Sequence, residues 1–436
     1  MKKLVILHID GLSAAMLGQA VDAGLMPHVR RLLEGEGYEL HRYRCGVPST
    51  TPFAQAGILY GDNREIPSFR WWDRERQLLV KFGAGSTFKK VADKYFNGCH
   101  PLTRGGACIA ACYPGGAAET FGIAYQDRSY VAPGGSRSAA AVLVPYLANP
   151  IHLGDWVGQT LRVIGRTLRD VTTTRREGGH PAPRYVATDV AEEVFVHHLT
   201  RYAVEKAMRE GYSPIYAGFY AFDETAHAFG PSDPAARRIL EHVDHTIGRI
   251  ARARDDRYEM VVLSDHGQVD SIPYRLGELL PGRPRMTASG GLGHIYLADG
   301  GRRLSFSEVK AARPDLLSWL QAREEVALVM ARDGSEDVLL FNGPGISAYD
   351  DPDILRDQLS RLNSFANCGD LVVFGAFKNG KQVNFEEQAG GHGSIGGEQL
   401  HPFVLAKKEW GLNTSQVTGA HELHPLLCDL RDALAT

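Results

Sequence analysis

The sequence predicts an α/β fold: a three-layer α/β/α sandwich with a mostly parallel central sheet, plus inserted cap subdomains. Strand-length apolar runs alternate with amphipathic helical segments at the start of the chain and again from residue 186, which is typical of βαβ units. In addition, three apolar runs far apart in the sequence each end in an aspartate. They are LVILHI before Asp10, PIYAGFYAF before Asp223 and MVVLS before Asp265.

The predicted elements follow this alternation along the chain. Glycines, prolines and polar residues that commonly begin or end helices separate them. Strands are expected at 4–9, 38–45, 214–222 and 259–264, and helices within 26–37, from Pro48 to Gly61, and over 154–170, 187–210 and 234–253. A strand in HPFVLA and a leucine-rich helix would complete the C-terminal part.

Two regions interrupt the alternation and predict the domain organisation. Residues 63–185 are rich in glycine, proline and aromatic residues, and we interpret them as an inserted cap or lid. Residues 275–385 contain short strand-like runs, which indicate a smaller inserted subdomain. The catalytic core would then consist of 1–62, 186–274 and 386–436.

Composition narrows the class of protein. The 436-residue chain has a formal net charge of -3, so it carries no nucleic-acid-binding signature. It has no apolar run near the ~20 residues that span a bilayer. The apolar run at the N-terminus is shorter than the ~7–15 residues of a signal-peptide core. The six scattered cysteines indicate reduced thiols, so we expect a cytoplasmic protein, and a homo-oligomer is compatible with the sequence.

The three aspartates predict a metal centre. Ligands of open α/β sheets bind beyond the carboxyl ends of the strands, so neighbouring strands would bring these carboxylates together. Such a cluster repels itself unless cations occupy it. His227 lies four residues after Asp223 and His266 directly follows Asp265, while His392 between two glycines supplies a third imidazole. Together these residues indicate two cations.

A nucleophile is expected in the segment VPSTTPF. A hydroxyl at the start of a helix faces free backbone N–H groups, which suit a phosphate. A divalent cation would lower the pKa of that hydroxyl. Ser49, Thr50 and Thr51 all lie in this segment, and any of them could instead be a helix N-cap.

These motifs, in this order, resemble the alkaline phosphatase superfamily, and most closely its type I phosphodiesterase/nucleotide pyrophosphatase branch. The resemblance rests on Asp10-Gly11, Pro48-Ser-Thr-Thr51 followed by AGILYG, Asp223-x-x-x-His227, Asp265-His266-Gly267 and His392-Gly393. It implies a phosphoric ester hydrolase in which Thr51 is the nucleophile and a phospho-threonine forms. One ion would be held by Asp223, His227 and His392; Asp10, Asp265, His266 and Thr51 would hold the other. Zinc is expected, with manganese as the alternative.

The sequence departs from this branch where a phosphate-contacting asparagine is expected. The stretch here is SFRWWD, in which Arg70 could contact a phosphate oxygen and Trp71 and Trp72 could line the substrate site. The departure leaves phosphodiester and phosphomonoester substrates open. The alternatives are a sulfatase, a phosphotransferase and a non-catalytic binding protein, but every motif position that the resemblance requires is present.

Overall fold

The computed structural model describes residues 1–81, 87–122, 146–176, 183–297 and 301–436. Its central sheet has seven strands in the order β2-β18-β8-β1-β7-β5-β6. These strands are β1 (Lys3–Ile9), β2 (Tyr38–Arg42), β5 (Ala107–Ile109), β6 (Glu119–Phe121), β7 (Ile215–Phe219), β8 (Tyr258–Leu263) and β18 (Phe403–Lys407).

The sheet is mostly parallel, as predicted. Strand β1 pairs in parallel with β7 on one side and β8 on the other, and β5 continues the parallel arrangement beyond β7. Only β18 runs antiparallel to its neighbours β8 and β2 within the described part of this sheet. The three strands that lead to Asp10, Asp223 and Asp265 are therefore direct neighbours, with their carboxyl ends at one edge.

Both faces of the sheet are buried, which makes the three-layer sandwich. Leu4 and Ile6 of β1 pack in one hydrophobic core, while Val5 and Leu7 pack in a second core on the opposite face. Successive side chains of a strand point to opposite faces, so continuous apolar strands need a helical layer on each side. The first core includes α3 (Thr51–Tyr60) and α14 (Ala420–Ala435). The second includes α1 (Ala14–Asp22), α2 (Pro27–Gly35), α7 (Pro183–Glu210) and α9 (Pro234–Ala253).

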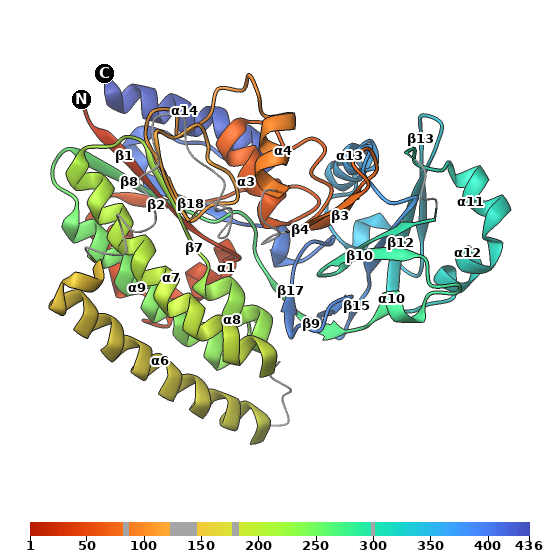
Figure 1. Ribbon diagram of the computed structural model, residues 1–436, viewed down its shortest axis with the longest axis horizontal. Helices are drawn as coiled ribbons and strands as arrows, with labels where there is room; N and C mark the ends of the chain where they lie inside the picture. The colour runs from red at the N-terminus through yellow and green to blue at the C-terminus, as the bar shows by residue number, and fades with distance from the viewer. Residues whose placement is uncertain (82–86, 123–145, 177–182, 298–300) are drawn as a thin grey trace.

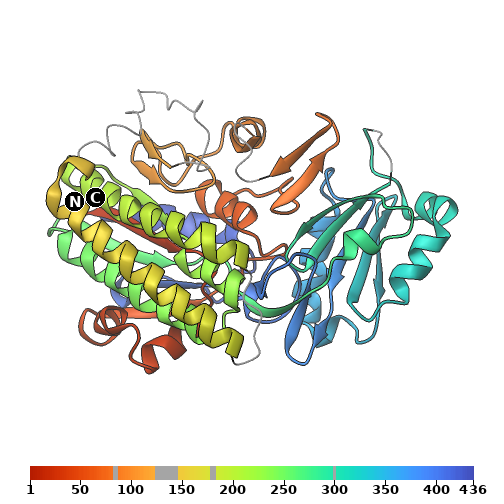
Figure 2. The ribbon, with the colours of Figure 1, turned by 60° about the horizontal axis from the view of Figure 1, so that its bottom comes forward.

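The helices α8 (Ala221–Phe229) and α6 (Pro150–Arg176) complete this part of the molecule. Helix α8 packs between α7 and α9, and α6 lies outermost against α7 (Figures 1 and 2). No helix within the described ranges is long and apolar enough to cross a membrane. All six cysteines are free thiols.

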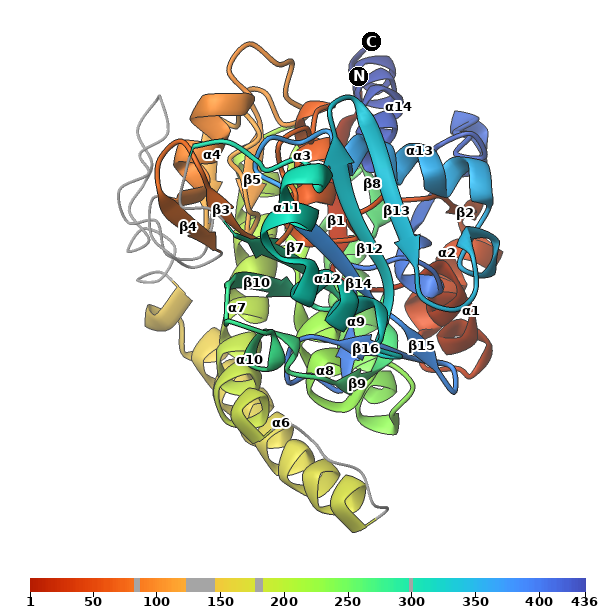
Figure 3. The same ribbon diagram turned by 90° about the vertical axis from the view of Figure 1, so that its right-hand side faces the viewer.

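A second, five-stranded antiparallel sheet lies beside the sandwich, in the order β10-β11-β14-β12-β13 (Figure 3). Its strands are β10 (Arg285–Ser289), β11 (Leu292–Tyr296), β12 (Val326–Asp333), β13 (Glu336–Phe341) and β14 (Leu371–Gly375). Its helices are α10 (Leu276–Leu279), α11 (Phe306–Ala312), α12 (Pro314–Gln321) and α13 (Pro352–Asn363). One face packs with α11 and α12, while the other shares the hydrophobic core of α3 and α14.

Smaller elements connect the two sheets. They are the four-stranded sheet of β9 (Val269–Pro273), β15 (Phe377–Lys378), β16 (Lys381–Asn384) and β17 (Gly390–Gly391), the hairpin of β3 (Arg70–Asp73) and β4 (Leu78–Lys81), and α4 (Thr87–Tyr95). The five-segment division stays a prediction. Nevertheless, β5 and β6 fall within the range predicted as a cap and instead extend the central sheet, because their backbone groups pair in parallel with β7.

Candidate metal centre

The three aspartates meet at the carboxyl edge of the central sheet. Asp10 directly follows β1, and Asp265 lies two residues beyond β8. The backbone leaves the extended conformation at Tyr220, so β7 is shorter than the predicted strand 214–222 and Asp223 lies in the first turn of α8. All three carboxylates are buried, with at most 6% of each residue exposed.

Asp223, His227 and His392 form the first group. His227 lies one helical turn after Asp223, and its Nε2 is 3.1 Å from Asp223 Oδ2. His392 comes from the loop after β17, and its Nε2 is 3.9 Å from Asp223 Oδ1. The Nδ1 atoms of His227 and His392 contact the backbone oxygens of Gly390 and Ser49 at 3.0 and 2.7 Å. Both rings therefore present Nε2 to the cluster, as histidine ligands of metals do.

The second group contains Asp10, Asp265, His266 and Thr51. His266 Nε2 lies 3.4 Å from Asp10 Oδ1, 3.4 Å from Asp265 Oδ2 and 3.1 Å from Thr51 Oγ1. Thr51 Oγ1 is 3.5 Å from both carboxylate oxygens of Asp10. The rings of His266 and His392 stack with centroids 4.0 Å apart. The two groups are therefore adjacent, and His266 lies at their boundary.

Electrostatics in the cluster are those of a site built for cations. Burial, together with Asp265 and Asp223, raises the pKa of Asp10 well above its usual value. Burial also raises the pKa of Asp223, but the neighbouring histidines outweigh it and hold that pKa below its usual value. Burial lowers the pKa of His392 to about 3. The metal-free cluster thus retains protons on some acids, which divalent cations would displace.

Two further observations fit cations into this cluster. Asp265 Oδ2 is buried, accepts no hydrogen bond and lies next to His266 Nε2, so it has the position of a metal ligand. Gly11 has a positive φ of 71°, and a Cβ there would lie 2.3 Å from Asp223 Oδ1. The chain therefore leaves room at the carboxylate that only glycine permits. A set of aspartate oxygens and imidazole nitrogens suits zinc.

The structure distinguishes the three candidate hydroxyls. Ser49 Oγ donates to Gln399 Oε1 at 3.2 Å and accepts the Gly393 N–H at 2.9 Å, so it supports the loop that carries His392. Thr50 is the N-cap residue of α3, but its side chain makes no capping hydrogen bond. Thr51, the first residue of α3, is the hydroxyl that faces the carboxylates and His266.

The three residues predicted to contact substrate have different surroundings. Trp71 is 1% exposed and packs in the core of α3, so it lies away from any ligand surface. Arg70 is half-buried and forms an ion pair with Glu386. Trp72 is also half-buried, and the Arg285 guanidinium lies 3.8 Å from its ring centroid.

Sequence reasoning missed three buried polar residues next to the cluster. Gln268 Nε2 donates to the backbone oxygen of Asp223 at 3.0 Å and also contacts its carboxylate. His8 Nε2 is 3.0 Å from Asp265 Oδ1, and Gln55 Nε2 is 3.3 Å from His8 Nδ1. His8 precedes Asp10 by two positions and so shares its face of the strand, which was an available signal.

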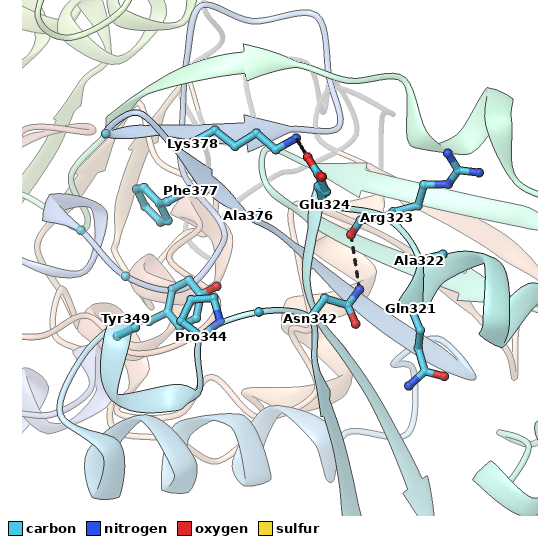
Figure 4. Close-up of a pocket in the computed structure, with 15 residues that line it drawn as sticks. Gln321, Ala322, Arg323, Glu324, Asn342, Pro344, Tyr349, Ala376, Phe377 and Lys378 are labelled. Atoms are coloured by element: carbon cyan, nitrogen blue, oxygen red, sulfur yellow. Dashed lines mark hydrogen bonds and ion pairs between the residues drawn. The ribbon is translucent and has the colours of Figure 1, made fainter.

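A separate cavity of about 760 Å³ lies beside the five-stranded sheet (Figure 4). Tyr349, Phe377, Asn342 and Lys378 line it, together with Gly396 and Gly397 of the loop that follows His392. None of the residues of the two groups lines this cavity. It is therefore distinct from the candidate metal centre.

Comparisons with known proteins agree with this geometry. The family model of type I phosphodiesterase/nucleotide pyrophosphatase matches residues 4–317. A search of curated proteins returns no match.

Among solved structures, phosphonoacetate hydrolase from Sinorhizobium meliloti in complex with phosphonoacetate has a TM-score of 0.57 at 17% identity, over 99% of this chain and 96% of that chain. Human ectonucleotide pyrophosphatase/phosphodiesterase 5 has a TM-score of 0.57 at 13% identity, over 99% and 95%. An inactive threonine-to-alanine variant of the murine protein in complex with AMP has a TM-score of 0.55 at 13% identity, with the same coverage.

These likenesses show a shared fold, and the family match covers most of the chain. The chain therefore belongs to the type I phosphodiesterase/nucleotide pyrophosphatase family of the alkaline phosphatase superfamily and is a phosphoric ester hydrolase.

Proposed function

We propose that the protein hydrolyses a small-molecule phosphate ester with Thr51 as nucleophile. The observation that carries the proposal is the position of Thr51 Oγ1, 3.1 Å from His266 Nε2 and 3.5 Å from the Asp10 carboxylate, at the start of α3. The structural relative described as an inactive threonine-to-alanine variant supports a threonine in this role.

We assign Asp223, His227 and His392 to one divalent cation, and Asp10, Asp265, His266 and Thr51 to the other. Zinc is the first candidate and manganese the second. When bound, the cations lower the pKa of the Thr51 hydroxyl and neutralise charge on the phosphoryl group. The first-turn N–H groups of α3 face the same region, where they stabilise an anion.

Two displacements at phosphorus complete the reaction. Thr51 Oγ1 forms a bond to phosphorus, its proton passes to solvent, and the bond between phosphorus and the leaving oxygen breaks. The phospho-threonine is then hydrolysed by water, which restores the hydroxyl and releases phosphate or a phosphomonoester. Asp10 and His266 hold Thr51 in line with phosphorus through contacts already present.

A phosphodiester is the first candidate substrate, and a phosphomonoester is the alternative. A monoester carries an additional negative charge, for which Arg70 was the candidate partner. Arg70 already pairs with Glu386 and donates to the backbone oxygen of Ala288 at 3.3 Å, so its charge is compensated. Arg70 and Trp72 stay proposed contacts with the leaving group.

An activity panel tests the proposal. Zinc-loaded and manganese-loaded proteins are compared on bis-p-nitrophenyl phosphate, p-nitrophenyl phosphate, p-nitrophenyl sulfate and phosphonoacetate. Thr51→Ala should abolish turnover without changing metal content. Thr50→Val is the matched control, because it removes a neighbouring hydroxyl that makes no capping hydrogen bond. Full activity of Thr51→Ala would refute the mechanism, and turnover of the sulfate ester alone would indicate a sulfatase.

We also propose a cytoplasmic location, which the six free thiols support. Burial raises the pKa of Cys45, Cys108 and Cys112, so these thiols resist oxidation. Alkylation of protein taken directly from cells should label six thiols after denaturation. A homo-oligomer stays a prediction, which light scattering of the purified protein tests.

A further inference from the structure

We propose that His8 and Gln55 are positioning residues that orient the Asp265 carboxylate toward the cation shared with Asp10, His266 and Thr51. The inference rests on the metal centre of the proposed function. It adds two residues outside the assigned ligand set, and it predicts that they control the affinity of one cation.

The two oxygens of Asp265 have different surroundings. Oδ1 accepts the backbone N–H of His266 at 2.9 Å and that of Gly11 at 3.4 Å, and it lies 3.0 Å from His8 Nε2. Oδ2 is buried and accepts no hydrogen bond. The carboxylate is therefore held through one oxygen, which leaves the other for a cation.

Gln55 fixes the tautomer of His8. The backbone N–H of Cys112 donates to Gln55 Oε1 at 2.8 Å, and this determines which end of the amide is oxygen. The amide nitrogen then donates to Tyr220 Oη at 3.0 Å and faces His8 Nδ1 at 3.3 Å. Because the amide nitrogen is a donor, Nδ1 is the acceptor, and the proton of the neutral ring is on Nε2, next to Asp265 Oδ1.

The ring of His8 is held in this orientation. His8 and Gln55 are both 0% exposed. The His8 ring stacks on Tyr216 with centroids 5.7 Å apart and meets the edge of Tyr220 at 6.1 Å. Its contact with Asp265 is an electrostatic one, because the N–H does not point straight at the oxygen. This charge-assisted contact opposes rotation of the carboxylate.

The same network reaches the nucleophile. Gln55 lies four residues after Thr51 on α3, so one helical turn separates the amide from the hydroxyl. Loss of His8 or Gln55 should therefore loosen the cation that Asp265 and Thr51 share. The cation at Asp223, His227 and His392 has no contact with this network among the interactions described above, so it should keep its affinity.

Metal binding tests the inference independently of catalysis. Zinc affinity and stoichiometry are measured by competition with a chromophoric chelator for wild type, His8→Ala, His8→Gln and Gln55→Leu. We expect His8→Ala and Gln55→Leu to weaken one of the two ions about 10–100-fold, the usual effect of removing a residue that orients a ligand. His8→Gln should restore most of the affinity, because its amide can donate to Asp265.

His294→Ala is the matched control. His294 is equally buried, but its ring contacts the backbone of Pro67 and Gly369 in another part of the fold. Its loss should leave both zinc affinities unchanged. Repeating His8→Ala in a His227→Ala background identifies the weakened ion, because that background removes a residue of the other group.

The outcomes separate the two proposals. Unchanged zinc affinities in His8→Ala, an equal loss at both ions, or failure of His8→Gln to restore binding would overturn the positioning role. A wild-type protein that binds fewer than two ions would overturn both proposals. If wild type binds two ions but hydrolyses no ester, only the proposed function fails, and the affinity comparison still decides the role of His8.

Discussion

His227 Nε2 lies 3.1 Å from Asp223 Oδ2, one turn apart on a single helix, so a proton joins these residues in the metal-free protein. Burial alone would lower the pKa of His227, but the Asp223 carboxylate outweighs burial and raises that pKa to about 9. A metal ligand must be an unprotonated imidazole. The pair is therefore a preformed site in which a proton competes with the cation.

The first prediction concerns the pH dependence of metal binding. Below pH 9 the cation at Asp223 must displace the proton of His227, so its affinity should rise by about tenfold per pH unit between pH 7 and pH 9 and then level off. Zinc titrations at several pH values in dilute buffer, with the released protons measured, check this. A flat affinity over that range would contradict it.

The second prediction concerns metal removal. Cations bind the folded cluster and not the unfolded chain, so each ion at a hundredfold excess over its Kd should add about 2.7 kcal/mol to the free energy of unfolding. Urea unfolding of chelator-treated and zinc-loaded protein measures this difference. Thr51→Ala should be stabilised by zinc nearly as much as wild type, because six aspartate and histidine ligands remain. Equal stability with and without zinc would count against the two-ion site.

The third prediction concerns Gly11. In Gly11→Ala the new Cβ would lie 2.3 Å from Asp223 Oδ1 at a positive φ of 71°, so the carboxylate must move. Zinc content and ester hydrolysis should both fall at least about tenfold, as expected when a metal ligand is displaced. Gly24→Ala is the control, because Gly24 also has a positive φ, of 77°, but a Cβ there meets open space. Similar losses in both variants would point to backbone strain instead.

The fourth prediction concerns stability at acid pH. Burial lowers the pKa of His294 from 6.5 to about 3, so the folded protein keeps this ring neutral. Below pH 6.5 the unfolded chain binds a proton that the folded protein does not, and stability falls as pH falls. His294 should therefore account for a loss of about 2 kcal/mol between pH 7.5 and pH 5.0.

Urea unfolding of wild type and His294→Gln at these two pH values measures that contribution. The glutamine cannot titrate, yet its amide can still reach the backbone of Pro67 and Gly369, which the ring contacts at 3.1 Å each. The variant should lose less stability than wild type on acidification. An equal loss in both proteins would mean that other groups control the acid response.

Much of the fold could be predicted from the sequence. Helix α9 begins and ends at the predicted residues, because Asp233 caps it, Pro234 suits its first position and its apolar residues recur with helical spacing. Strands β1, β7 and β8 are continuous apolar runs, which is the pattern of strands buried on both faces. Helix α7 begins four residues before the predicted start, since no strong capping signal marks its N-terminus.

By itself, the sequence determined the types of residue at the ends of these strands and the local spacing of Asp223 with His227, because both depend on short-range periodicity. Only the tertiary structure decided which oxygen of Asp265 is available, that Thr51 and not Ser49 or Thr50 faces the cluster, and that His8 and Gln55 support it. It also placed β5 and β6 in the central sheet. These relationships join residues up to several hundred positions apart, and a one-dimensional pattern does not encode distances that arise only when the strands pair and the helices pack.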